Sequence, residues 1–196
     1  YFPHNLIGLS ERLTDHLAEP PTGRAREGLW QLRAHEVVLA TGAIEQPLVF
    51  PGNDRPGIML ASAAQSYLHR YGVRAGSRAV VVTATDDAYR AALDLHEAGV
   101  KIAAIADLRA NANDALLQAV RGAGIEVLTR ATVLGTRGNL RVGSIDIGTR
   151  DNAGHVRERR PLSCDLVLMS GGFTPSVHLF SQSRGKLQWQ EAARTF

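Results

Sequence analysis

Residues 36–42 read Glu-Val-Val-Leu-Ala-Thr-Gly, and residues 165–172 read Asp-Leu-Val-Leu-Met-Ser-Gly-Gly. Each segment is an acidic residue, an unbroken apolar run, a hydroxyl residue and glycine. An apolar run without alternation is typical of a strand buried on both faces of a parallel sheet. Because ligands of open α/β sheets bind beyond the carboxyl ends of the strands, the small residues predict a ligand site there. We therefore expect one sheet that contains both segments, with a second domain inserted between them.

The region between the two segments has the layout of a nucleotide-binding unit. Buried strands are predicted at residues 78–83, 100–106 and 125–128, and two helices alternate with them. The first helix is expected to be capped by Asp86 or Asp87. Right-handed crossovers would make these strands a small parallel sheet with helices packed on it.

Turn residues and apolar spacing predict the flanking elements. A hairpin is expected over residues 5–34, because two strand-like runs are separated by Pro-Pro-Thr-Gly. A helix should begin at Ser62, with Gln65 at the capping-box spacing, and stop at Gly72. Beyond residue 129, three short alternating runs predict an antiparallel meander that precedes the second segment.

These elements predict an α/β protein with a Rossmann-like three-layer dinucleotide-binding fold, an inserted second Rossmann-like domain and a small antiparallel β-meander. We expect a partial first dinucleotide-binding domain at residues 1–60 and the inserted domain at residues 61–130. Residues 131–196 would form the meander and return to the first domain. The sequence opens on the hairpin rather than on a strand, glycine loop and helix, so we expect it to be a piece of a longer polypeptide.

Composition excludes several classes of protein. The chain has 196 residues and a formal charge of +3, a weak basic excess that predicts no nucleic-acid partner. No apolar run approaches the roughly 18 residues of a membrane span and no signal peptide is visible, so we expect a cytoplasmic protein without a membrane partner. One cysteine, Cys164, excludes a disulfide framework and is expected in the core. The spacing of the histidines predicts no metal site, and no catalytic set is visible.

The turn at residues 83–88 departs from the dinucleotide fingerprint G-x-G-x-x-G/A. Thr83 and Thr85 stand where glycines normally allow close approach to a pyrophosphate. Asp86 and Asp87 add negative charge at a helix N-terminus that would otherwise favour an anion. Asp107 lies at the spacing expected for a carboxylate that binds a ribose diol. Two interpretations stay open: the insert binds a nucleotide, or it is a Rossmann domain that has lost its ligand.

The ends of the two apolar segments are the stronger candidate site. We expect Thr41, Gly42, Ser170, Gly171 and Gly172 to meet at one edge of a sheet and to bind a cofactor. Glycine at these positions would let the backbone approach a ligand without an intervening Cβ.

Several motifs resemble a known family. They are Val-Val-Leu-Ala-Thr-Gly-Ala at residues 37–43, Asn-Asp-Arg-Pro-Gly-Ile-Met-Leu at residues 53–60 and Tyr-Arg-Ala-Ala-Leu-Asp-Leu at residues 89–95. The most specific is Ser-Gly-Gly-Phe-Thr-Pro-Ser-Val-His-Leu-Phe-Ser-Gln-Ser at residues 170–183. The layout resembles flavoproteins with two dinucleotide domains, of thioredoxin-reductase and glutathione-reductase type. More closely, the motifs resemble the family of alpha subunits of heterotetrameric sarcosine oxidases.

This resemblance implies a function in oxidative demethylation of sarcosine to glycine, with the other sarcosine oxidase subunits as partners. It implies NAD in the first domain, lined by Thr41, Gly42 and residues 170–172, and a structural insert. Flavins and folate would belong to the complex and are not expected on this piece, which alone should be inactive. Alternatives are a component of a related amine, opine or cyanide-forming dehydrogenase, or a non-catalytic scaffold whose nucleotide sites are lost. A disulfide reductase is disfavoured because Cys164 has no second cysteine to pair with.

Overall fold

The computed structural model describes residues 6–192 and 195–196. The chain divides into two compact units. One, here called the sheet unit, is Glu45–Phe173. The other, here called the hairpin unit, combines Tyr1–Ile44 with Thr174–Phe196. Each unit is described separately below.

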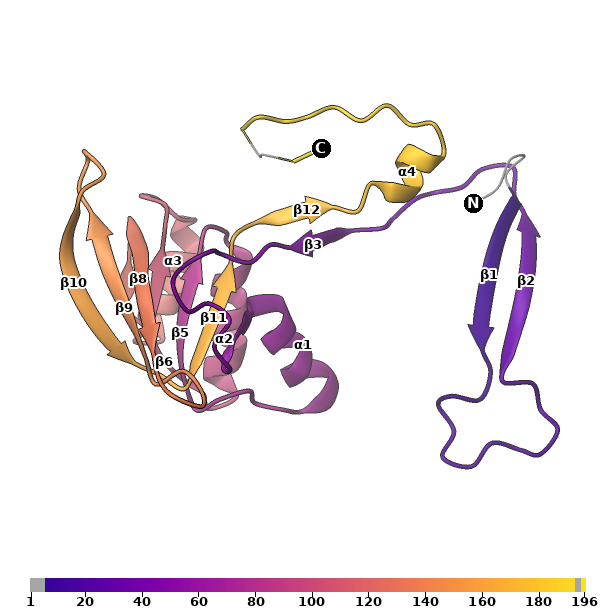
Figure 1. Cartoon of the computed structure of the whole chain (residues 1–196), viewed down its shortest axis with the longest axis horizontal. Coiled ribbons are helices and arrows are strands. Elements are labelled where there is room, and N and C mark those ends of the chain that lie inside the picture. Colours follow the sequence, from indigo (N-terminus) through magenta and orange to yellow (C-terminus); the bar gives the residue numbers. More distant parts are fainter. Residues whose placement is uncertain (1–5, 193–194) are drawn as a thin grey trace. The chain divides into compact units, whose positions relative to one another are not determined.

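A five-stranded parallel sheet forms the centre of the sheet unit (Figure 1). Its strand order is β4-β11-β5-β6-β7, so the strand latest in sequence lies between two early ones. Three helices belong to the same unit: α1, α2 and α3. The bounds are Ile58–Leu60 (β4), Ala61–Tyr71 (α1), Arg78–Thr83 (β5), Asp87–Glu97 (α2), Lys101–Asp107 (β6), Asp114–Gly122 (α3), Val127–Leu128 (β7) and Leu166–Ser170 (β11).

The residues of β5 alternate between two hydrophobic cores. Ala79 and Val81 pack with the buried residues of α1, α2 and α3. Val80 and Val82 pack on the other face, against the antiparallel meander. The meander has the order β10-β9-β8, with bounds Ala131–Arg137 (β8), Ser144–Arg150 (β9) and Val156–Ser163 (β10). The parallel sheet is thus covered by helices on one face and by the meander on the other (Figure 1), which confirms the predicted three-layer α/β fold.

The hairpin unit contains the predicted antiparallel hairpin. Strands β1 (Leu6–Arg12) and β2 (Glu27–Arg33) pair along their whole length. The same unit contains a short helix, α4 (His178–Gln182). Where the chain passes between the units, β3 (Ala43–Glu45) and β12 (Phe173–Pro175) form a two-stranded sheet.

The expectation that residues 36–42 form a buried strand is wrong. This segment has no regular secondary structure, and Val38 is 90% exposed. A strand of a parallel sheet needs at least one hydrogen-bonded neighbour, and no described strand pairs with this segment. The related segment does form a buried strand, β11, but its neighbours are β4 and β5 of the sheet unit. The two segments therefore do not share one sheet among the described residues.

The predicted start of α1 also needs correction. The helix begins at Ala61, and Ser62 lies inside its first turn rather than at the cap. The Ser62 N–H and hydroxyl both donate to Glu45 Oε2, at 2.9 and 2.5 Å, while Gln65 donates to Asp94. A carboxylate from a distant segment therefore takes the role predicted for a capping box. The predicted stop at Gly72 is confirmed, with φ of 65°.

The third strand of the insert is shorter than predicted, because only Val127–Leu128 pairs in the sheet. The domain division with boundaries after residues 60 and 130 stays a prediction. In the sheet unit, the elements of residues 61–130 and the strands β8 to β11 contribute to the same pair of hydrophobic cores.

Candidate functional site

The turn after β5 is filled by its own side chains. Thr83 Oγ1 accepts a hydrogen bond from the Thr85 N–H at 2.9 Å and lies 2.9 Å from the Thr85 carbonyl. Thr85 Oγ1 lies 3.0 Å from Ser170 Oγ, and the Ala84 N–H donates to the Ser170 carbonyl. In a dinucleotide turn, backbone N–H groups at this position point at phosphate oxygens. Here, the N–H groups of Ala84 and Thr85 already have protein acceptors.

Asp107, the carboxylate at the position expected to bind a ribose, is also hydrogen-bonded within the chain. Asp107 is fully buried and accepts hydrogen bonds from Tyr89 Oη at 2.8 Å and from the Arg109 backbone N–H and guanidinium. Arg109 in turn donates to Asp86 Oδ1 at 2.8 Å. Asp86, one of the two cap candidates, precedes α2 but makes no side-chain cap hydrogen bond. These four residues, here called the Asp107 network, join β6, α2 and the turn before α2.

The electrostatics of this network disfavour a phosphate. Two carboxylates share one guanidinium, so the group carries a net negative charge. The hydrogen bond to Asp107, together with that to Asp86, raises the pKa of Arg109 above its ordinary value. Burial, then the hydrogen bond to Asp107, raises the pKa of Tyr89. The Ala84 and Thr85 N–H groups therefore have internal partners, and two carboxylates lie beside the turn, so these residues fit a dinucleotide poorly.

The predicted site residues at the end of β11 have different surroundings. Ser170 is fully buried and belongs to the turn contacts described above. A Cβ at Gly171 would lie 3.0 Å from the Pro47 carbonyl and 3.1 Å from the Gln46 carbonyl. The close approach of residues 46–48 thus leaves little room for a side chain at this position. Gly172 has φ of 129°, and a Cβ at that position would meet nothing within 4 Å.

The other two predicted site residues lie in the hairpin unit. Thr41 Oγ1 donates to the Ser176 carbonyl at 2.6 Å, and the Ser176 N–H donates to the Gly42 carbonyl at 2.9 Å. Gly42 has φ of 66°, and a Cβ at that position would meet nothing within 4 Å. Of the five predicted residues, only Gly42 and Gly172 have open space where a Cβ would lie. Their carbonyls nevertheless accept hydrogen bonds from the N–H groups of Ser176 and Gln46, so all five residues have contacts within the chain.

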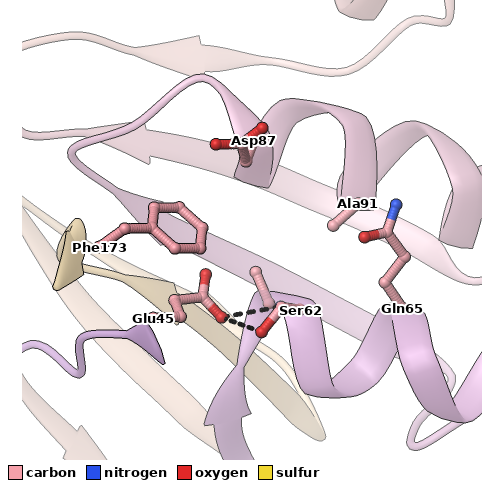
Figure 2. A pocket seen from close by; sticks show the side chains of 7 residues that line it. Glu45, Ser62, Gln65, Asp87, Ala91 and Phe173 are labelled. Atoms are coloured by element: carbon pink, nitrogen blue, oxygen red, sulfur yellow. Dashed lines mark hydrogen bonds between the residues drawn. The ribbon is translucent and has the colours of Figure 1, made fainter. Parts of the chain in front are cut away.

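The sheet unit also holds a pocket of about 310 Å³ that sequence reasoning missed (Figure 2). Its lining comes from the segment before α1, from α1 and α2, and from the segment after β11: Glu45, Ala61, Ser62, Gln65, Asp87, Ala91 and Phe173. Glu45 is only 6% exposed. In sequence it lies among turn signals, and the signal that could have found it was an isolated acid within an apolar stretch.

Two further properties limit the chemistry of the described residues. They contain no group of three or more histidine, cysteine or acidic side chains placed to hold a metal ion. None of the described helices is both long and apolar enough to cross a membrane. Cys164 is buried in the core, as predicted, and burial raises the pKa of its thiol to about 11.

Comparisons with known proteins agree with this architecture. The chain is 43% identical to the sarcosine oxidase alpha subunit of Corynebacterium sp. (strain P-1) over 98% of its length, and spans 20% of that protein. It is 29% identical to an opine oxidase subunit of Agrobacterium tumefaciens (strain Ach5), covering 84% of the chain and 35% of that protein. The structure of the thioredoxin reductase of T. acidophilum is similar, with a TM-score of 0.60 at 20% sequence identity. The match covers 77% of this chain and 48% of the reductase chain.

The predicted resemblance to sarcosine oxidase alpha subunits is therefore confirmed, and the chain spans about a fifth of the length of the relative of that name. The family model for pyridine nucleotide-disulphide oxidoreductases matches residues 19–195. This chain belongs to the pyridine nucleotide-disulphide oxidoreductase family.

Proposed function

We propose that this chain is the central region of the alpha subunit of a sarcosine oxidase-like complex, which demethylates sarcosine oxidatively to glycine. The observation that carries the proposal is 43% identity to such a protein over 98% of the chain. Because the chain spans a fifth of that relative, the substrate and the partner subunits are part of the proposal. Amine oxidation is assigned to flavins elsewhere in the complex, and this region contributes NAD binding and subunit scaffolding.

Within this proposal, Thr41, Gly42, Ser170, Gly171 and Gly172 contribute to NAD binding in the longer protein. The assignment is supported by the open, positive-φ backbone at Gly42 and Gly172. It is also supported by the turn at residues 83–88, where internal hydrogen bonds occupy the Ala84 and Thr85 N–H groups that would otherwise face a pyrophosphate. Bound NAD would supply a nicotinamide redox group, and the open backbone at Gly42 and Gly172 would allow its close approach.

A component of an opine-oxidising complex is the second candidate, supported by the similarity to the opine oxidase protein of A. tumefaciens. Turnover by the assembled complex decides between them. We expect sarcosine-dependent hydrogen peroxide formation, with opines as the alternative substrates in the same assay. A complex that oxidises opines and leaves sarcosine unchanged would refute the sarcosine assignment.

A non-catalytic scaffold is the third candidate, supported by the Asp107 network. Calorimetric titration of the complete alpha subunit with NAD tests it. We expect NAD to bind, and Gly172→Ala to weaken binding at least tenfold, about 1.4 kcal/mol. Gly154→Ala is the matched control, since Gly154 also has a positive φ, of 84°, and open space around it. Absence of NAD binding supports the scaffold, whereas equal affinities for both variants would move the site away from Gly172.

A further inference from the structure

We infer that the pocket between α1 and α2 binds a small organic ammonium ion. The inference does not depend on the proposed function, because it rests on the geometry of the sheet unit alone. The pocket has a volume of about 310 Å³, which is enough for a ligand of a few heavy atoms. Its lining combines two carboxylates, an amide, a hydroxyl and an aromatic ring (Figure 2).

Glu45 places a carboxylate in this pocket. It is a buried residue, with only 6% of its surface exposed. The Ser62 N–H and hydroxyl both contact the same carboxylate oxygen, Oε2. Figure 2 shows the other oxygen turned away from Ser62 and toward the space beside Phe173. A buried carboxylate favours a positive partner because its charge is poorly screened there.

Gln65 presents an acceptor rather than a donor. Its Nε2 donates to Asp94 Oδ2 at 2.6 Å, and Asp94 also contacts His69 Nε2 at 2.8 Å. Burial raises the pKa of Asp94, but the hydrogen bonds from Gln65 and His69 outweigh that effect and lower it below its ordinary value. An ionised Asp94 can only accept, so the Gln65 amide nitrogen must face it. The amide oxygen is therefore the atom left for the pocket, as Figure 2 shows.

The remaining lining groups agree with this polarity. Asp87 is a second carboxylate at the rim, where Oδ1 pairs with Arg90 at 2.7 Å and the side chain is 57% exposed. Ser62 uses its hydroxyl hydrogen on Glu45. Phe173 adds an aromatic ring, whose face attracts cations. No lysine or arginine lines this pocket of the sheet unit.

A ligand that matches this lining has several N–H donors, a positive charge and a short apolar group. An anion would meet Glu45 and Asp87, and a neutral alcohol offers one donor and no charge. A primary or secondary ammonium ion satisfies all three requirements. The Glu45 oxygen and the Gln65 oxygen would accept its hydrogen bonds, and Phe173 would contact its alkyl group.

Titration of the isotopically labelled full chain with n-propylammonium, followed by nuclear magnetic resonance, tests the inference. We expect saturable shifts of the backbone amides of Ser62 and Ala91, and no such shifts with n-propanol. Equal shifts with n-propanol would show an apolar cleft without charge recognition and overturn the inference. Displacement of n-propylammonium by equimolar potassium would identify an inorganic cation site and also overturn it.

Two variants locate the site. Glu45→Gln removes the charge but keeps an oxygen for the Ser62 N–H, and we expect at least tenfold weaker binding. Asp114→Asn removes one carboxylate from the exposed first turn of α3, outside the pocket, and we expect affinity within twofold of the wild type. Unchanged affinity in Glu45→Gln, or an equal loss in both variants, would refute a specific role of Glu45. Amide spectra of both variants without ligand check that the fold is intact.

Discussion

Replacing Tyr89 by phenylalanine is expected to lower the unfolding free energy of the sheet unit by about 2 kcal/mol. Tyr89 and Asp107 are both fully buried, and the tyrosine hydroxyl donates to Asp107 Oδ2 at 2.8 Å. A hydrogen bond to a charged group contributes about 1.5–3 kcal/mol. Asp107 keeps its contacts with Arg109 in the variant, so the loss should stay within that range. Phenylalanine fills nearly the same volume, so no large cavity is added to the cost.

Urea unfolding followed by far-ultraviolet circular dichroism is the appropriate measurement. Helices α1, α2 and α3 all belong to the sheet unit and dominate that signal. Tryptophan fluorescence would report the other unit, because Trp30 and Trp189 both lie there. Tyr67→Phe is the control, since Tyr67 is 47% exposed, and should change stability by less than about 0.5 kcal/mol. A Tyr89→Phe variant as stable as this control would refute the closed Asp107 network.

The same residue predicts a pH dependence. Burial and the Asp107 hydrogen bond raise the folded-state pKa of Tyr89 above its ordinary value of 10.0. Its contribution is therefore complete below pH 10 and is lost as the pH rises from 10 toward the folded pKa, by up to about 1.4 kcal/mol per pH unit. The Tyr89→Phe variant should lack this part of the alkaline loss, and parallel pH curves for both proteins would contradict the assignment.

Three further predictions concern a tight glycine contact, the buried cysteine and the cap of α3. Gly171→Ala should destabilise by about 1–3 kcal/mol in urea unfolding, because its Cβ would lie 3.0 Å from the Pro47 carbonyl. Gly122→Ala is the control, because a Cβ at the end of α3 would meet open space and should not destabilise the protein. Equal destabilisation by both variants would refute the steric argument. Cys164 should react slowly with a thiol reagent at pH 8 in the native chain, because burial raises the pKa of its thiol to about 11. It should react rapidly once the chain is unfolded. A fast reaction of the native chain would contradict this expectation. Asn113→Ala should cost about 1 kcal/mol, since its side chain caps two N–H groups of α3; no change in thermal unfolding would show the cap to be dispensable.

The local pattern of the sheet unit was predictable from sequence. The strand at Arg78–Thr83 was identified, and the start of α3 was narrowed to Asn113 or Asp114, because buried β-branched runs and Asx caps are signals contained in a few neighbouring residues. The fold class followed from the order of these elements. The buried Cys164 followed from its place before an apolar run.

What failed depended on contacts between distant residues. Residues 36–42 have the same apolar pattern as β11, but only β11 has strands on both sides. Ser62 and Gln65 have the spacing of a capping box, yet Glu45, 17 residues earlier, provides the acceptor. The pocket was missed for the same reason, since Glu45, Asp87 and Phe173 come together only through the fold. Periodicity contains no information on such pairings.

The Asp107 network also bears on how the stability of the turn depends on nucleotide concentration. Where a turn is ordered by a bound nucleotide, the ligand adds to the free energy of unfolding an amount that grows with the logarithm of the nucleotide concentration. Here, Thr83, Thr85 and Arg109 provide from within the chain the contacts that a dinucleotide would provide. The order of the turn at residues 83–88 thus comes from contacts within the chain rather than from a nucleotide bound in the turn. A newly made chain can therefore adopt this turn before a nucleotide is bound.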